Sequence, residues 1–159
     1  MVIMMNPWSS APLDSNDDGR VEINAKPDPT QTQIIRVMES LNFNYARILN
    51  LSDLRQPNSN VFYGQISSMN EDCINHSIFH ESRLCDFKKL YIKGVPVLYA
   101  WGTNKKLNHL AKCALKATKL ERSFGWRKPK FDFAYYHPLP RGYIKQIKWY
   151  ESIIIEFNN

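Results

Sequence analysis

Four short apolar runs, each ending at polar or turn-forming residues, constrain the fold of this chain more than any other feature. They occupy residues 2–5, 45–51, 95–101 and 131–136. Short apolar runs bounded by Asn, Gly or Pro are typical of buried β-strands. We therefore expect four strands, with Pro96 at the start of the third, where its missing N–H disturbs pairing least.

Segments with helical periodicity separate these runs. Asp28 followed by Pro29 is typical of a helix start, and this helix should end near residues 42–44. Its apolar face is expected to hold Ile34, Ile35, Met38 and Leu41. Further helices are expected from a cap at residues 70–72 through Ile78, over residues 103–120, and over residues 142–155 with Ile144 inward. Residues 11–30 are predicted to be a long loop, and residues 58–69 to be irregular.

The alternation of strands and helices decides the fold class. Strands that alternate with helices favour a parallel sheet covered on both faces. We therefore predict an α/β fold, a three-layer αβα sandwich with a central four-stranded parallel sheet. The 159 residues are expected to form a single domain over residues 1–159.

Composition excludes several classes of protein. No apolar run reaches the length that spans a membrane, and no basic segment precedes an apolar one at the N-terminus. The three cysteines contain no CxxC pair and are too few for an all-cysteine iron–sulfur cluster. The sequence therefore predicts a cytoplasmic protein with no membrane association and no cofactor.

Charge is distributed unevenly along the chain. Residues 1–80 hold five Lys and Arg against nine Asp and Glu, whereas residues 81–159 hold sixteen against six. Tyr, Trp and Phe are interleaved with the basic residues of the second half. Such a surface suits nucleic acid, because phosphates attract the cations and bases stack on the rings. The alternative is a solvated basic surface that keeps the protein in solution.

A pair of histidines raises the question of a metal. His76 and His80 would lie on one face of the helix expected there, a spacing that can bind zinc. No third ligand stands nearby in the sequence, so we predict no metal site.

Polar residues follow each predicted strand. Asn6 and Pro7 follow the first, Asn50 the second, Gly102 the third, and His137 with Pro138 the fourth. In a parallel sheet these positions gather at one edge, where ligands bind. Pro138 and Pro140 would stiffen the last loop and hold His137 and Arg141 in fixed directions. Alternatively, the prolines only end a strand and His137 is a satisfied core histidine.

Four motifs carry a resemblance to known proteins. The segments MMNPWSS, ILNL, VLYAWG and HPLPRG, in this order, resemble an uncharacterised bacterial family of unknown function. More distantly they resemble the uracil-DNA glycosylase superfamily, over nearly the whole chain from Ile3 to about Tyr150. The resemblance implies a uracil-DNA glycosylase-like fold and the excision of uracil or a related base from DNA.

The resemblance also implies roles for individual residues. Asn6 would position water, and His137 would donate a hydrogen bond to the oxyanion that develops on the departing base. Asn50 would read the base edge, and Trp8 and Pro7 would contact the flipped base. Contacts to DNA, single-stranded or duplex, are expected from Arg141, Ser9, Ser10, Pro138, Pro140 and Lys145.

Departures from the superfamily pattern leave alternatives open. The most efficient members carry a carboxylate where this chain has Asn6, and an amide is not a general base. The chain is therefore expected to be either a slow or narrow glycosylase or a catalytically inactive DNA-binding module. In the inactive case Tyr135 or Tyr136 would fill the base pocket. A third alternative is a hydrolase of free nucleosides or nucleotides. We expect a monomer.

Overall fold

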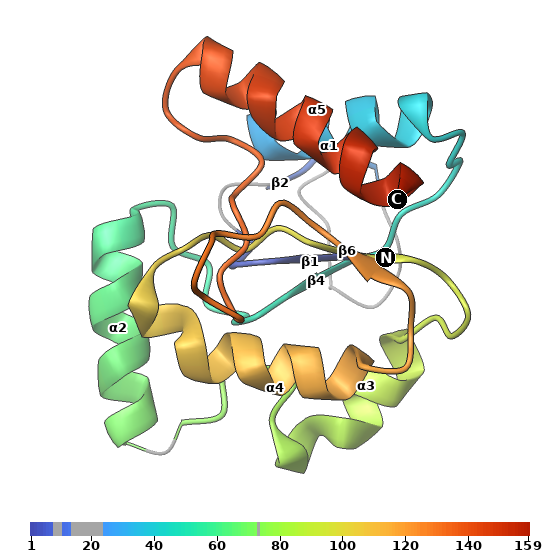
Figure 1. The fold of residues 1–159 in the computed structure, drawn as a ribbon. Coiled ribbons are helices and arrows are strands. Elements are labelled where there is room, and N and C mark those ends of the chain that lie inside the picture. The colour runs from blue at the N-terminus through green and yellow to red at the C-terminus, as the bar shows by residue number, and fades with distance from the viewer. Residues whose placement is uncertain (8–10, 14–23, 73) are drawn as a thin grey trace.

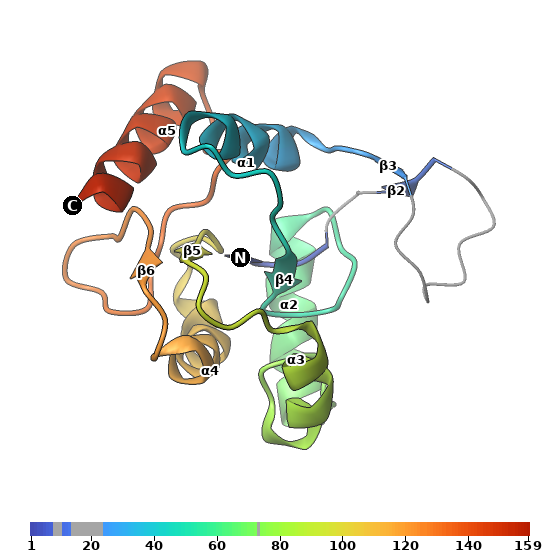
Figure 2. The same ribbon diagram turned by 90° about the vertical axis from the view of Figure 1, so that its right-hand side faces the viewer.

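A four-stranded parallel sheet lies at the centre of the protein (Figure 1). The computed structural model describes residues 1–7, 11–13, 24–72 and 74–159. In spatial order the strands are β4 (Ile48–Asn50), β1 (Val2–Met4), β5 (Val97–Tyr99) and β6 (Ser123–Phe124). In register, Val2 lies opposite Ile48 on one side and Leu98 on the other. A short antiparallel pair, β2 (Ala11–Pro12) and β3 (Ala25–Lys26), stands apart from this sheet (Figure 2).

Helices cover both faces of the sheet, so the predicted α/β class with a four-stranded parallel sheet is confirmed. On one face lie α1 (Pro29–Ser40) and α5 (Tyr143–Asn158). On the other lie α2 (Ser59–Glu71), α3 (Leu84–Leu90) and α4 (Asn108–Thr118). Short 3₁₀ turns, η1 (Glu81–Arg83) and η2 (Lys105–Leu107), precede α3 and α4. Among the described residues, no helix is both long enough and apolar enough to cross a membrane.

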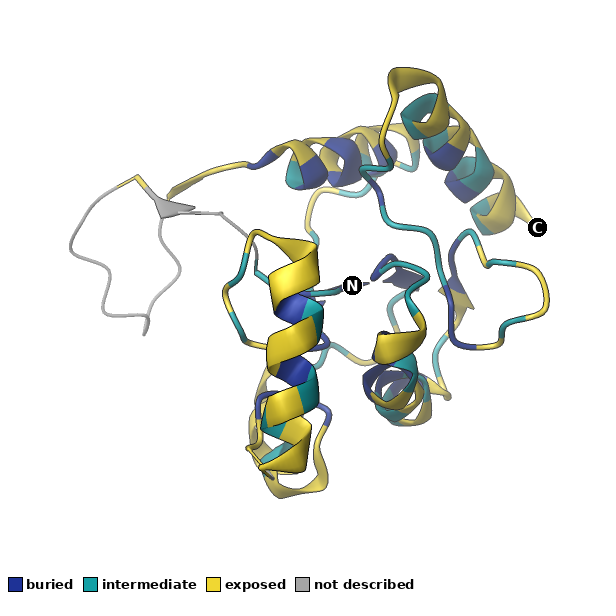
Figure 3. Cartoon of the chain, turned by 90° about the vertical axis from the view of Figure 1, so that its left-hand side faces the viewer, coloured by how far each residue is buried: buried dark blue, intermediate teal, exposed yellow. Residues whose placement is uncertain are grey.

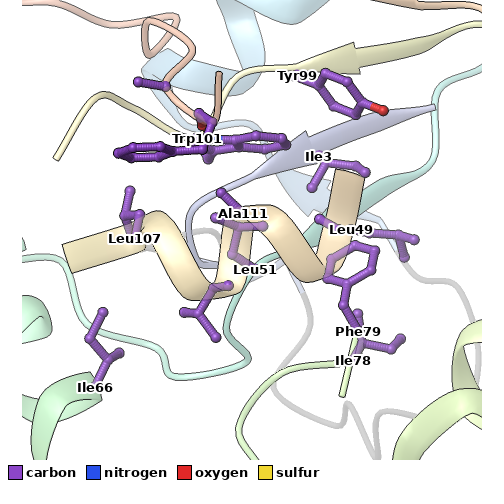
Figure 4. Close-up of a cluster of buried hydrophobic side chains, with 14 of the residues drawn as sticks. Ile3, Leu49, Leu51, Ile66, Ile78, Phe79, Tyr99, Trp101, Leu107 and Ala111 are labelled. Atoms are coloured by element: carbon purple, nitrogen blue, oxygen red, sulfur yellow. The ribbon is translucent and has the colours of Figure 1, made fainter. Parts of the chain in front are cut away.

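Alternation along β1 builds two hydrophobic cores. Ile3 faces α2, α3 and α4, together with Leu49 and Trp101. Val2 and Met4 face α1 and α5 and pack with residues of those helices, Ile34, Val37, Trp149 and Ile153. In the first core the Trp101 ring lies close to α4, near Leu107 (Figure 4). Its indole Nε1–H donates to the Phe133 carbonyl at 2.8 Å, so a buried ring ties a distant loop to the sheet.

The predicted fourth strand is wrong. The strand that pairs with β5 is β6, with Val97 opposite Ser123, whereas residues 131–136 form only isolated bridges through Tyr135. Directly after β6, Gly125 lies against the backbone of β5. A Cβ atom at this position would stand 2.6 Å from the Tyr99 carbonyl oxygen. The aromatic residues of 131–136 therefore pack around the sheet, and their strand-like composition reflects burial in loops.

The predicted helix through Ile78 is also wrong. Residues 59–71, expected to be irregular, form α2, and residues 74–80 contain no helix. Asn58 caps α2 by accepting from the N–H groups of Asn60 and Val61. Phe62 and Ile66 are buried along the inner side of α2, while much of its surface is exposed (Figure 3). Burial of these two side chains outweighs the low helix propensity of the Asn and Ser residues around them.

Three further elements were not predicted: α3, and the strands β2 and β3, which lie in the segment expected to be a long loop. The remaining elements match the prediction in place but differ in detail. β5 is shorter than residues 95–101, and α4 is shorter than residues 103–120. Ile35 and Ile144, both expected to face inward, are exposed. Val37 in α1 and Trp149 in α5 are buried instead, because each helix is rotated relative to the expected apolar face.

Candidate functional site

A cavity of about 420 Å³ opens at the carboxyl ends of β1 and β5. The chain leaves β1 toward α1 on one face of the sheet and leaves β5 toward α4 on the other. Such a divergence between neighbouring parallel strands creates the crevice in which α/β proteins bind ligands. The cavity is lined by Met4, Met5, Asn6, Asp28, Thr30, Pro57, Ser59, Tyr63, Trp101, Gly102, His137, Leu139 and Arg141.

Asn6 follows β1 and is held rigidly. Its side chain is only 5% exposed, and its Nδ2 group donates to the carbonyl of Leu54 at 3.2 Å and to that of Gln56 at 2.7 Å. Carbonyl oxygens only accept hydrogen bonds, so the amide orientation is determined by its partners. The Oδ1 atom has no hydrogen bond to a described residue and remains available as an acceptor for water.

His137 is held in one tautomer. Its Nδ1 accepts the Leu139 N–H at 3.1 Å, so the proton of the neutral ring lies on Nε2. Burial lowers the pKa of His137 to about 4, although the nearby Asp28 charge acts in the opposite direction. At neutral pH the ring is therefore uncharged and presents an N–H donor. Nε2 has no hydrogen-bond partner among the residues described.

The loop after His137 is stiff, as the prolines predict. Pro138 is buried, and the Pro140 carbonyl accepts from the Gln146 side chain at 3.2 Å. Gly142 then adopts a φ of 98°, which favours glycine, before α5 begins. Arg141 lines the cavity with an exposed side chain, and Lys145 is exposed in the first turn of α5. The structure thus brings together Asn6, His137 and Arg141.

Asn50 lies in a smaller neighbouring cavity of about 170 Å³. This second cavity shares Met4, Asn6 and Asp28 with the first, and Pro7 and Arg55 also line it. The buried Oδ1 atom of Asn50 has no hydrogen-bond partner in the part of the chain that the structure describes. A buried acceptor without a hydrogen-bond donor lowers the stability of the folded protein, so it marks a position where a ligand or water donates.

Sequence reasoning missed four polar residues of the cavity, Asp28, Thr30, Ser59 and Tyr63. Asp28 was expected only as a helix cap, but helix starts that follow parallel strands lie at the same sheet edge as the strand ends, and this signal could have found it. Tyr63 was missed because the segment that forms α2 was expected to be irregular. Its hydroxyl donates to the Met5 sulfur at 3.5 Å, and burial raises the pKa of this phenol, so it stays protonated.

Trp8, expected to contact the flipped base, and Ser9 and Ser10, expected to contact DNA, lie outside the described residues. Tyr135 packs against the rings of Tyr99 and Trp101, and neither it nor Tyr136 lines the cavity that holds His137.

Cations lie near the openings of both cavities. Besides Arg141, Arg55 lines the smaller cavity, and the Lys106 ammonium lies 3.5 Å from the carbonyl of Tyr63, which lines the larger one. Cationic groups in such positions can contact the phosphates that flank a nucleoside.

His76 belongs to a different part of the molecule. It is buried, and its ring nitrogens bond to Ser52 Oγ at 2.9 Å and to Asn70 Oδ1 at 3.1 Å. His76 and His80 do not share a helical face, because their segment is not helical. In the part of the chain that the structure describes, no group of three His, Cys, Asp or Glu side chains is arranged to hold a metal ion.

Comparison with known proteins adds nothing to this geometry. No family model, curated protein or solved structure matches the chain. The residues of the two cavities therefore carry the functional information.

Proposed function

We propose that this protein binds DNA and excises uracil or a related base from it, slowly or with a narrow range of bases. One observation supports the proposal above the others. The neutral ring of His137, with its proton on Nε2, and the anchored amide of Asn6, whose Oδ1 accepts no hydrogen bond from a described residue, line the same cavity. A hydrogen-bond donor and an acceptor for water are the two groups that the hydrolysis of an N-glycosidic bond needs at this point.

In the proposed reaction a nucleotide turns out of the DNA stack into the larger cavity. As the bond between C1′ and the base breaks, the electron pair moves onto the base, whose oxygen accepts a hydrogen bond from His137 Nε2. Water that donates to Asn6 Oδ1 adds its oxygen to C1′ and loses one proton, which ends on the departed base. The volume of about 420 Å³ falls within the range of about 300–1,000 Å³ typical of small-molecule sites.

Base recognition is assigned to Asn50 within this proposal. Its orphaned Oδ1 lies in the adjoining cavity, which shares Asn6 and Asp28 with the first. An amide can present both a donor and an acceptor to the edge of a uracil-like base. Trp8 and Pro7 keep their proposed contacts with the flipped base.

DNA binding is assigned to the surface around the cavity. Arg141 and Lys145 are exposed beside it, and the next residues on α5 include Tyr143, 72% exposed, and Ile144, 82% exposed. Exposed aromatic and apolar side chains beside cations suit unstacked bases and their phosphates. Ser9, Ser10, Pro138 and Pro140 complete the proposed DNA contacts.

The remaining parts of the proposal concern the state of the protein. It acts as a monomer in the cytoplasm and uses no cofactor. Cys85 and Cys113 are free thiols, which suits a reducing compartment.

A catalytically inactive DNA-binding module is the second candidate. The chemistry of Asn6 favours it, because the Nδ2 group of this residue donates to two carbonyls and an amide cannot accept a proton from water. This candidate predicts salt-sensitive DNA binding that depends on the basic half of the chain and no release of base.

The test uses single-stranded and duplex oligonucleotides, each with one uracil, incubated with excess protein and then cleaved by alkali at abasic sites. The unaltered protein should release uracil, and His137→Ala should lose release while keeping DNA binding on a native gel at two salt concentrations. His109→Ala, which changes an exposed histidine outside the cavity, is the matched control and should release uracil normally.

Each outcome of this test decides between the candidates. Release that survives in His137→Ala would contradict the proposed site. Salt-sensitive binding without release from uracil-containing DNA would favour the inactive module.

A further inference from the structure

We propose that Asp28 accepts the proton of the attacking water, the step that the amide of Asn6 cannot perform. This inference rests on the function proposed above. Asp28 lines both cavities, as does Asn6, so the carboxylate and the Asn6 amide border the same two adjoining cavities.

The Asp28 carboxylate is held firmly in place. Its Oδ1 atom accepts the Gln31 N–H at 2.8 Å, and its own N–H donates to Gln31 Oε1 at 2.9 Å. This reciprocal pair, a capping box, fixes the side chain at the start of α1. Asp28 is only 9% exposed, and Oδ2 has no hydrogen bond within the described part of the chain. Oδ1 therefore caps α1, and Oδ2 is the oxygen that can accept a proton.

Asp28 stands at the N-terminus of α1, where the positive end of the helix dipole lies. The ring of His137 lies close enough for the Asp28 charge to act on it, and that ring is neutral. A charged acceptor and a neutral donor therefore line one cavity. The buried Oδ1 atom of Asn50, which lines the smaller cavity together with Asp28 and has no hydrogen-bond partner among the described residues, is an independent sign that the site holds a ligand.

The step balances as follows. The water oxygen forms a bond with C1′, while the C1′–N bond breaks and its electron pair leaves with the base. One water proton passes to Asp28 Oδ2, and the other stays on the new C1′ hydroxyl. His137 Nε2–H hydrogen-bonds to the base oxygen without giving up its proton. Asp28 then releases the proton to solvent or to the departed base, and the carboxylate is restored.

The variant that tests this role is Asp28→Asn, supported by Asp28→Ser. Asn and Ser are both good N-cap residues, so both variants keep the start of α1 while removing the carboxylate. In single-turnover reactions on uracil-containing DNA, we expect the rate of base release to fall about 100-fold in each. DNA affinity and the thermal unfolding midpoint should stay close to those of the unaltered protein. Asp132→Asn, which removes an exposed carboxylate outside the cavity, should react normally.

Rescue separates a chemical role from a structural one. In Asp28→Ser the shorter side chain leaves room for a small carboxylate, so added formate should restore part of the lost rate. A residue that only caps the helix would show no such rescue.

The outcomes distinguish this inference from the proposed function. If the unaltered protein releases uracil and Asp28→Asn releases it equally fast, the role of Asp28 is wrong and the proposed function stands. Loss of rate in both variants without any rescue by formate would also overturn the role as base. If the unaltered protein releases no base, the proposed function and this role both fail.

Discussion

Acidification should destabilise the protein through His137, and the size of the effect can be worked out. Burial lowers the pKa of this histidine from its ordinary value of 6.5 to about 4. Between these values the unfolded chain binds a proton that the folded protein excludes. The stability that His137 contributes is therefore complete above pH 6.5 and is lost as the pH falls toward the folded pKa. Linkage gives a loss of about 2 kcal/mol in the free energy of unfolding between about pH 7.5 and pH 5.

Urea denaturation at the two pH values measures this loss. His137→Asn removes the titrating group, while its Oδ1 can still accept the Leu139 N–H in place of Nδ1. The variant should lose about 2 kcal/mol less than the unaltered protein over the same pH interval. His76, whose pKa burial also lowers, contributes equally to both proteins and cancels in the difference.

A matched control comes from His80. Its Nδ1 accepts the Ser82 N–H at 3.2 Å, the same local bond, but on an exposed segment. His80→Asn should leave the pH dependence unchanged. Equal losses in the unaltered protein and His137→Asn would refute the reasoning, because His137 would then not be held neutral by burial.

Two further predictions concern the cavity and its rim. Asn6→Asp should lower the free energy of unfolding in urea by about 2 kcal/mol or more, because it sets an oxygen against the Leu54 and Gln56 carbonyls. Unchanged stability would contradict the orientation of the Asn6 amide. Arg141→Ala should reduce the slope of log binding constant against log salt by about 1 in DNA titrations. Lys89→Ala, an exposed cation on α3, is the control, and a slope in Arg141→Ala equal to that of the unaltered protein would exclude a phosphate contact.

Much of the site was predictable because the sheet gathers strand ends at one edge. Asn6 follows β1, and that strand was visible as a run of apolar residues. Segment 131–136 is not a strand, yet it is anchored at the same edge through the bond from the Gly102 N–H to the Tyr135 carbonyl at 2.8 Å. His137 therefore reaches the cavity by a different route from the one expected.

The residues that were missed depend on tertiary contacts. α2 has only Phe62 and Ile66 fully buried, so its sequence lacks the strong periodicity that marks a helix, and the position of Tyr63 could not be inferred. Asp28 was predicted correctly as a cap, but its place in the cavity follows from the position of α1 against the sheet. The strand β6 has two residues, too few to stand out from the loops around it.

The orientation of the Asn6 amide is determined by hydrogen bonds to residues of a neighbouring loop. They run to backbone carbonyls of Leu54 and Gln56, in the connection between β4 and α2, so the side chains of those residues are not involved in the contact. An insertion or deletion in this connection would turn the amide without altering any group that faces the ligand. Evolution could thus adjust reactivity through the length of a surface loop, and related chains with an identical set of cavity residues could differ widely in rate.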